Sequence, residues 1–398
     1  MNEILSEIWN IWFFTAVIAF LTVYWVFQNK QWRRLLLLLL SLALIATVQP
    51  ETAIALCAYC WLVFQVGKLL RRDNQRYKRI GIACISLVVV FLVFLKHLNV
   101  SVNQLLEQGG LSFTIVVPLG ISYFSFRAIH YLIECGRGTL PPHTFASFLL
   151  YLVFIPTFPS GPIERFEAFQ AAEPGAFRAD VFVDGLRRVL FGLAKKLLVA
   201  DLLLRQTLGG LPLEDLAQQE NSIDLLLVWK RLILYYLYCY FDFAALSDLA
   251  IGIGLLLGFR ICENFNWPIL ARDLGDFWQR WHMSLANFCR YYIFLYVLSY
   301  TRRYYLGFLC TMLAIGLWHG ISLNWAIWGA YHATGLYLFL FVRNHLSTKA
   351  RIIYDSPLLV VPRILVTFCF VALGYVWVGT STPYQALRLL KAAFSISN

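Results

Sequence analysis

The stretch IGIACISLVVVFLVFL, from Ile80 to Leu95, decides the fold of this chain, because it runs without a single charged side chain. A helix needs about 20 apolar residues to cross the hydrocarbon core of a bilayer, and this run approaches that length. Three other apolar runs are equally clear: Ile11 to Phe27, Leu323 to Phe341 and Leu358 to Val378. None of them alternates with period two, so they predict membrane-spanning helices rather than barrel strands.

The composition also indicates a membrane protein. Of the 398 residues, 60% are apolar and 14% charged, whereas soluble domains carry about 25% charged residues. With the shorter and interrupted runs included, we expect roughly ten to twelve hydrophobic helices, some re-entrant or interfacial. The prediction is an all-α polytopic integral membrane protein. Short polar breaks predict one domain over residues 1–398, with N-terminal helices in 1–117, a core in 118–335 and C-terminal helices in 336–398.

The net charge of +11 does not indicate a nucleic-acid partner, because the basic residues gather at the ends of apolar runs. This pattern follows the positive-inside rule and places both basic groups on the cytoplasmic side, with the acidic N-terminus outside. Binding of membrane lipids is the alternative for the second group. The two groups are Lys30, Arg33 and Arg34, and Lys68, Arg71, Arg72, Arg76, Lys78 and Arg79.

Two stretches are too polar or too broken to span a bilayer. FIPTFPSGPIERFEAF, from Phe154 to Phe169, has three prolines and one glycine within nine residues, so it is not a regular helix. The second runs from Asn264 to Phe288 and contains Asp276 and Arg280, which are spaced for an ion pair on a helix. Irregular backbone at membrane depth is tolerated only inside protein or beside water, so both stretches are expected there.

His319 is the strongest candidate for chemistry. It stands where two apolar segments meet, between Gly316 and Gly320, and an ionisable side chain inside a spanning region is a functional hypothesis by default. In a dry pocket the neutral imidazole is favoured, and a neutral imidazole can act as a general base toward a hydroxyl.

The other histidines have less specific surroundings. His282 lies in the aromatic and charged stretch, where it could position substrate, share the proton transfer with His319 or complete the Asp276–Arg280 network. His332 is expected to be packed or to support the site, and His130 to be a hydrogen-bonded core residue.

Common catalytic signatures are absent from the sequence. It has no G-x-S-x-G, no P-loop lysine motif, no dinucleotide fingerprint and no H-E-x-x-H, and we predict no metal. The pair Cys57 and Cys60 lies on an apolar run, where core filling is the better interpretation than redox chemistry.

Four stretches together resemble the membrane-bound O-acyltransferases, in particular the bacterial branch that modifies cell-envelope polymers. Pro118–Arg127 (PLGISYFSFR) and Phe154–Phe169 resemble members that carry out D-alanylation, and Tyr240–Leu285, which ends in FWQRWHMSL, resembles members that carry out polysaccharide O-acetylation. GLWHG, Gly316–Gly320, is shared by both. The resemblance extends from about Pro118 to Gly335, over half of the chain.

The resemblance implies a funnel-shaped helical fold with a thin floor, in a multi-pass protein of the bacterial cytoplasmic (inner) membrane. It implies that His319 is the principal catalytic histidine and His282 its companion. The implied reaction moves an acetyl or D-alanyl group from a cytoplasmic thioester to a hydroxyl outside. The donor would be acyl-CoA or the phosphopantetheine of an acyl carrier protein, with no tightly bound cofactor. The acceptor would be an envelope glycopolymer or a periplasmic acyltransferase partner.

Further side chains are assigned to substrate binding or support. His282, Arg280 or Asn266 would steady the donor or the oxyanion, and Ser284 or a cysteine would serve if transfer passed through a covalent intermediate. One departure from the family pattern is Tyr291, which stands after Arg290 where relatives carry an Asp. The full supporting set is Arg280, Asn266, Asp242, Trp281, Trp318, Ser284 and Arg290. The rival interpretation is a non-enzymatic transporter or acyl-relay component in which the histidines form a proton relay.

Overall fold

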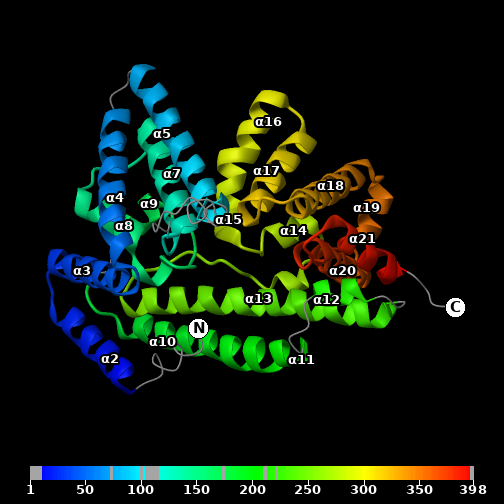
Figure 1. The fold of residues 1–398 in the computed structure, drawn as a ribbon, viewed down its shortest axis with the longest axis horizontal. Coiled ribbons are helices and arrows are strands. Elements are labelled where there is room, and N and C mark those ends of the chain that lie inside the picture. The colour runs from blue at the N-terminus through cyan, green and yellow to red at the C-terminus, as the bar shows by residue number, and fades with distance from the viewer. Residues whose placement is uncertain are drawn as a thin grey trace. The chain divides into compact units, whose positions relative to one another are not determined.

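The computed structural model describes residues 11–71, 75–98, 102–103, 116–172, 175–208, 213–219 and 223–394, and every regular element in these ranges is a helix (Figure 1). Within these ranges, six helices are long and apolar enough to cross a membrane, which confirms the prediction of an all-α polytopic membrane protein. They cover Lys30–Val48, Pro50–Leu70, Arg79–Leu98, Leu225–Leu256, Leu323–His345 and Pro357–Val378. Shorter apolar helices cover Val17–Val26, Phe145–Thr157 and Tyr304–His319.

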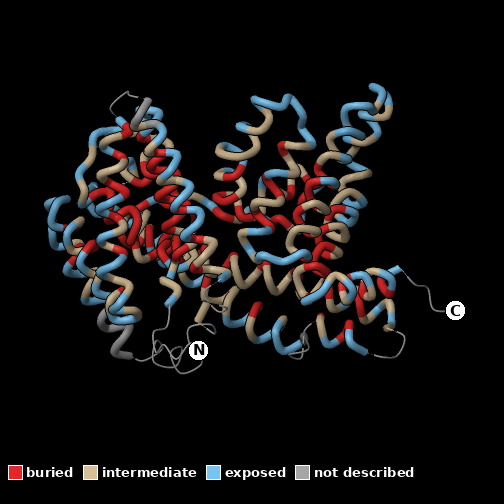
Figure 2. The backbone as a smooth tube through the Cα atoms, turned by 45° about the horizontal axis from the view of Figure 1, so that its top comes forward, coloured by how far each residue is buried: buried red, intermediate tan, exposed pale blue. Residues whose placement is uncertain are grey.

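The helices form two compact units, and buried residues gather inside each of them (Figure 2). The first unit consists of Met1–Leu190 and Asp248–Cys262, and the second of Phe191–Ser247 and Glu263–Asn398. Helix α13 (Leu225–Leu256) contributes residues to both units, as does α10 (Ala179–Ala194). The prediction of one domain, with N-terminal helices in 1–117, a core in 118–335 and C-terminal helices in 336–398, is not tested by these units and stays a prediction.

The first unit is built from helices that surround α7 (Ile121–Arg137). Both α4 and α5 pack on α7, and α8 packs on α3 and α4. The remaining bounds in this unit are α2 (Ile11–Val26), α3 (Lys30–Val48), α4 (Pro50–Leu70), α5 (Gln75–Val93), η1 (Phe94–Leu98), α8 (Phe145–Val153), η2 (Ile155–Thr157) and α9 (Phe166–Ala171).

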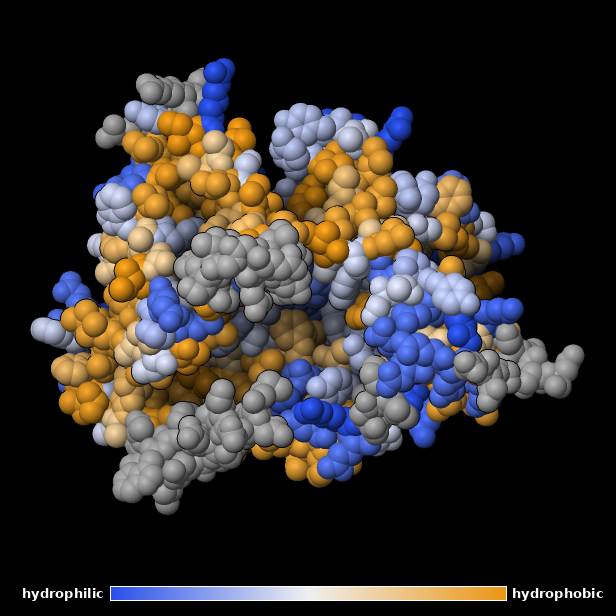
Figure 3. Space-filling model, in the orientation of Figure 1, coloured by the Kyte–Doolittle hydropathy of each residue, from blue (hydrophilic) through white to orange (hydrophobic). Residues whose placement is uncertain are grey.

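The outward faces of these helices are apolar, as expected for contact with lipid. On α5, Ile82, Leu87 and Val90 are 66%, 67% and 62% exposed, and Figure 3 shows apolar surface over this helix. Arg33, a member of the first basic group, lies inside the protein. Its side chain is buried and its Nη2 donates to the Gly175 carbonyl oxygen at 2.7 Å, because a guanidinium can satisfy a backbone acceptor inside the protein.

Arg127, on α7, holds the proline-rich stretch in place. It is 1% exposed, and its Nη1 donates to the Tyr151 carbonyl oxygen at 3.1 Å. Its Nη2 donates to the carbonyl oxygens of Thr157 at 3.0 Å and Pro162 at 3.3 Å. The stretch contains only the short helix η2 before α9 begins, so the prediction that it is not a regular spanning helix is confirmed. Carbonyls that lack a helical partner receive donors from the arginine instead.

His130 lies one helical turn along α7 and is equally buried. Its Nε2 lies 3.1 Å from the Phe166 amide nitrogen and 3.0 Å from Glu167 Oε2. The prediction that His130 is a hydrogen-bonded core residue is therefore confirmed.

The second unit contains the stretch from Asn264 to Phe288, which is broken into short helices rather than forming one regular span. This confirms the second irregular region that the sequence predicts. The pieces are η4 (Pro268–Leu270), α14 (Leu274–Trp278) and α15 (Met283–Cys289). The other bounds in this unit are η3 (Lys195–Arg205), α11 (Gln206–Leu208), α12 (Leu213–Gln218), η5 (Arg290–Phe294), α16 (Leu295–Thr301), α17 (Tyr304–His319), α18 (Leu323–His345), α19 (Thr348–Tyr354), η6 (Pro357–Leu359), α20 (Val360–Val378) and α21 (Pro383–Phe394).

Helices α17 and α18 touch through their backbones, because glycine stands at each point of approach. A Cβ atom on Gly316 of α17 would lie 2.4 Å from the carbonyl oxygen of Trp325. A Cβ atom on Gly329 of α18 would lie 2.6 Å from the carbonyl oxygen of Met312. This close contact fixes the end of α17, where His319 is the last residue.

Replacing Gly316 by alanine should therefore lower the stability of the protein by about 1–3 kcal/mol, the usual cost of overpacking. The clash is with backbone, which cannot move aside as a side chain does. The measurement is the melting temperature of the full chain in detergent. Gly136→Ala is the control, since no atom lies within 4 Å of the Cβ it would add. Equal melting temperatures for the two variants would contradict the role given to this contact.

Candidate active site

Asn264 is the polar centre of the irregular stretch, and it is completely buried. Its Oδ1 lies 2.9 Å from His282 Nδ1 and accepts from Ser284 Oγ at 2.9 Å and from the Ser284 amide at 3.3 Å. Its Nδ2 donates to Ser247 Oγ at 3.0 Å. Its own carbonyl oxygen accepts from the Met283 amide at 2.8 Å. One residue thus ties α13, the irregular stretch and the start of α15 together.

His282 sits directly before α15 in a left-handed backbone conformation, with φ 42° and ψ 53°. Its side chain lies in an aromatic pocket, with the ring of Phe243 edge-on at 4.7 Å and that of Phe265 stacked at 6.4 Å. Burial lowers the pKa of His282 to about 3, because the charged ring would lose its hydration. The imidazole is therefore neutral near pH 7. Its Nε2 is buried and has no hydrogen-bond partner in the part of the chain that the structure describes.

His319, in contrast, is exposed on the protein surface. Its ring stacks on Trp325 at 4.8 Å, with an angle of 15° between the planes, and also contacts Trp318 and Trp328. The expectation of a dry pocket thus applies to His282 and not to His319. His319 is the last residue of α17, and the chain becomes extended at Gly320 before α18 begins.

Trp318 connects the two histidines. Its ring centroid lies 6.4 Å from that of His282 and 4.4 Å from that of His319. The two imidazoles therefore lie no farther apart than the sum of these distances. The structure brings together both histidines that the sequence predicts, although they are far apart along the chain.

Arg280 and Asp276 form the predicted ion pair, with Nε 2.6 Å from Oδ1. Arg280 also donates through Nη1 to the Asn266 carbonyl oxygen at 3.3 Å, and the Asn266 amide donates back to the Arg280 carbonyl oxygen at 2.9 Å. Asn266 thus joins the network through its backbone, while the residue as a whole is exposed. Trp281 stacks on Phe277 at 5.6 Å and belongs to the aromatic wall of this region.

Asp242 and Arg290 lie outside this hydrogen-bond network. Asp242 pairs with Lys196 Nζ at 2.5 Å, and Lys196 also contacts Asp201 at 3.0 Å. This pairing gives Asp242 a structural partner that sequence spacing did not suggest. Arg290 is exposed and opens the π-helix η5, next to Tyr291.

Asn264 is the residue that the sequence analysis missed, since it assigned the nearby Asn266 instead. Its neighbours Glu263 and Phe265 are charged and aromatic, and nothing in this local sequence separates Asn264 from Asn266. His332 is buried against Trp278 at 5.4 Å and Trp328 at 4.6 Å, as a packed residue would be.

Within the described ranges, no three His, Cys, Asp or Glu side chains gather as metal ligands.

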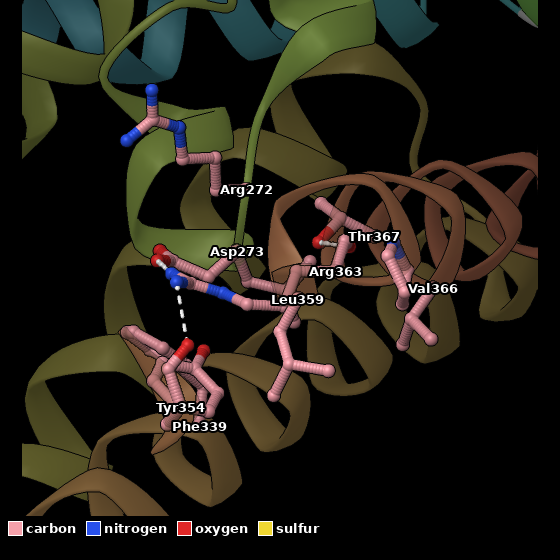
Figure 4. A pocket seen from close by; sticks show the side chains of 10 residues that line it. Arg272, Asp273, Phe339, Tyr354, Leu359, Arg363, Val366 and Thr367 are labelled. Atoms are coloured by element: carbon pink, nitrogen blue, oxygen red, sulfur yellow. Dashed lines mark hydrogen bonds and ion pairs between the residues drawn. The ribbon is translucent and has the colours of Figure 1, made fainter. Parts of the chain in front are cut away.

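A separate pocket of about 300 Å³ lies between α14, α18, α19 and α20, and it contains none of the predicted site residues (Figure 4). Arg363 lies across it, with Nη2 3.1 Å from Asp273 Oδ2 and its guanidinium 4.0 Å above the Tyr354 ring. Arg363 is paired with Asp273. The surface that faces into the pocket is therefore mainly apolar.

The fold and the paired histidines define a polytopic helical membrane protein with a neutral imidazole built into an irregular segment. Comparison with known proteins identifies its class. The family model described as the membrane-bound O-acyltransferase family matches residues 5–375. The chain belongs to this family, and it is an O-acyltransferase of the membrane.

Three relatives act on different polymers according to their names. A probable alginate O-acetylase, AlgI, of Pseudomonas aeruginosa is 29% identical over 97% of this chain and 74% of its own length. A teichoic acid D-alanyltransferase of Bacillus subtilis is 27% identical over 87% of this chain and 90% of its own length. A peptidoglycan O-acetyltransferase of Helicobacter pylori is 26% identical over 84% of this chain and 68% of its own length.

Proposed function

We propose that this protein transfers an acetyl or D-alanyl group from a thioester donor to a hydroxyl of a cell-envelope polymer, with His319 as the general base and His282 beside it. The observation that carries the proposal is the contact of Trp318 with both imidazoles, one exposed and one buried. An exposed base can meet a polymer hydroxyl that arrives from water. A buried neutral imidazole can meet the reacting group inside the protein.

The relatives support an envelope polymer as the acceptor. Alginate, teichoic acid and peptidoglycan appear in the names of proteins that match over 84% or more of this chain. What these three acceptors share is a hydroxyl on a polymer outside the cytoplasm. The bacterial cytoplasmic membrane is the proposed location, with acyl-CoA or the phosphopantetheine arm of a carrier protein as donor on the inner side.

The chemistry is a single displacement at the thioester carbonyl. His319 removes the proton of the acceptor hydroxyl as its oxygen attacks the carbonyl carbon. The new C–O bond forms, the C–S bond breaks, and the proton held by His319 passes to the departing thiolate. No oxidant or cofactor is needed for this balance.

Direct transfer is favoured over a serine intermediate by the contacts of Ser284. Its Oγ donates to Asn264 Oδ1 at 2.9 Å, and the residue is buried. A nucleophilic serine needs a base to take its proton, whereas this hydroxyl gives its hydrogen to an amide oxygen. Arg280 is held by Asp276, which leaves it a positioning role at the edge of the site.

A separate periplasmic acyltransferase is the second acceptor to consider, because its hydroxyl would receive the acyl group in the same reaction. The two acceptors differ in the molecule that carries the acyl group once it has left this protein, which is either the polymer itself or the periplasmic acyltransferase. The transporter interpretation loses its support, since the family consists of acyltransferases.

The test is mass spectrometry of envelope glycopolymers from bacteria with and without this protein. The expected result is loss of one acyl group, acetyl or D-alanyl, from one polymer. Expressing the wild-type chain again should restore the acyl group on that polymer. A second experiment supplies labelled acyl-CoA or labelled acyl carrier protein to isolated membranes, and the donor is the one that transfers its label. Envelope polymers with the same acylation in both strains would refute the proposal.

A further inference from the structure

The hydrogen bonds around Asn264 fix the position of the proton on His282. The Ser284 amide donates to Asn264 at 3.3 Å, and a backbone N–H can only donate, so the accepting atom of Asn264 is its oxygen. His282 Nδ1 lies 2.9 Å from the same oxygen. A carbonyl oxygen cannot donate, so Nδ1 carries the hydrogen. The neutral ring is then the Nδ1–H tautomer, and Nε2 holds the lone pair.

The ring is also held rigidly. Asn264 binds His282 through its side chain and binds the next residue through its backbone, with the Met283 amide 2.8 Å from the Asn264 carbonyl oxygen. Phe243 closes one edge of the ring at 4.7 Å. In an imidazole the two nitrogens lie on different sides of the ring, so Nε2 points away from Asn264.

Nε2 is the part of this arrangement that lacks a structural explanation. It is buried, it is a strong acceptor in this tautomer, and no described residue donates to it. Trp318, which contacts the His282 ring, also contacts His319. An acceptor atom held at this place suits a reacting O–H or S–H group.

We propose that Asn264 is a positioning residue of the acyl transfer: it holds His282 as the Nδ1–H tautomer so that Nε2 accepts a hydrogen bond from the hydroxyl or thiol of a substrate. The inference rests on the proposed function and deepens it, since it gives His282 a defined task beside His319. Ser247 and Ser284 complete the support, because they engage the two ends of the Asn264 amide.

The kinetic test compares Asn264→Leu and Asn264→Asp in the full chain, with Asn287→Leu as the matched control. Asn264→Leu removes the acceptor for Nδ1–H, and turnover should fall about 10²-fold at every pH, with little change in KM, since misplacing a catalytic group costs about that much. Asn287 is an exposed asparagine on α15 outside the hydrogen bonds around His282, so its variant should keep wild-type turnover.

The aspartate variant separates positioning from simple structural support. The carboxylate of the Asn264→Asp variant still accepts the hydrogen bond from His282 Nδ1–H, so the turnover of this variant should return toward that of the wild type at alkaline pH. Its negative charge also favours the imidazolium, which raises the pKa of His282 and takes away the Nε2 lone pair on acidification. The acid limb of the rate profile should therefore move to higher pH. Leucine and aspartate variants with equal turnover and profiles parallel to the wild type would overturn the proposal.

A second measurement is independent of activity. Ring nitrogen NMR of the ¹⁵N-histidine-labelled chain in detergent, with His282→Gln to assign the signal, should show a protonated Nδ1 and a bare Nε2. In Asn264→Leu the two tautomers should mix. A wild-type signal from the Nε2–H tautomer would overturn the inference. A wild-type protein that shows the expected tautomer but acylates no polymer would support the tautomer and refute the proposed function instead.

Discussion

Replacing His319 by alanine should reduce acyl transfer by about 10²–10⁴-fold, the range in which a general base contributes to catalysis. The side chain is exposed at the end of α17, and its ring lies on the surface of Trp325. Removing an exposed ring exposes part of one indole face and leaves α17 and α18 in contact through their glycines. The loss should therefore appear in turnover and not in the amount of folded protein.

The assay is acylation of the polymer by membranes that contain matched amounts of each variant. His345→Ala is a suitable control, because His345 is also an exposed histidine at the end of a helix, with Nδ1 2.8 Å from the Phe341 carbonyl oxygen. It should keep wild-type turnover. His319→Gln keeps hydrogen bonding but cannot take a proton, so it should be as inactive as the alanine variant. Full turnover in either His319 variant would rule out the general base.

Replacing Arg127 by methionine should strongly destabilise the first unit. The side chain is 1% exposed and donates to the carbonyl oxygens of Tyr151, Thr157 and Pro162. Each buried carbonyl left without a donor costs about 1–3 kcal/mol, so the sum reaches roughly 3 kcal/mol or more. Folded proteins are stable by about 5–15 kcal/mol, and this loss is a large fraction of that.

The measurement is the melting temperature and yield of the detergent-solubilised protein after size-exclusion chromatography. Arg137→Ala is the matched control on the same helix, since its side chain is 52% exposed and pairs with Glu134 near the surface. An exposed ion pair contributes about 0–1 kcal/mol, so this variant should behave as the wild type. Arg127→Met protein with the yield and melting temperature of Arg137→Ala would show that the carbonyls find other partners.

The sequence predicts well those features that depend on neighbours along the chain. Spanning helices follow from the length of apolar runs, and the six long helices of the described ranges include the stretches around Ile80, Leu323 and Leu358. The Asp276–Arg280 pair follows from helical spacing, and it forms as expected. The irregular backbone between Phe154 and Phe169 follows from its prolines.

Features that depend on tertiary contacts were not predictable in this way. Asn264 reaches His282 across 18 positions, and Asp242 reaches Lys196 across 46, and nothing in local spacing selects either partner. The exposure of His319 depends on how α17 ends, which is set by the glycine contacts with α18. The assignment of Asn266 in place of Asn264 shows the same limit, because the two lie in one short polar stretch and only the fold buries the first.

The left-handed backbone of His282 has a consequence for engineering this protein. A side chain other than glycine pays about 1–2 kcal/mol for that conformation, and His282 has φ 42°. The His282 ring fills an aromatic pocket and binds Asn264, so glycine here would relieve the backbone but leave a cavity, and large-to-small changes in a core cost about 2–5 kcal/mol. The strain at this position is therefore held in place by the packing of the ring, and heat-resistant variants are better sought at other positions.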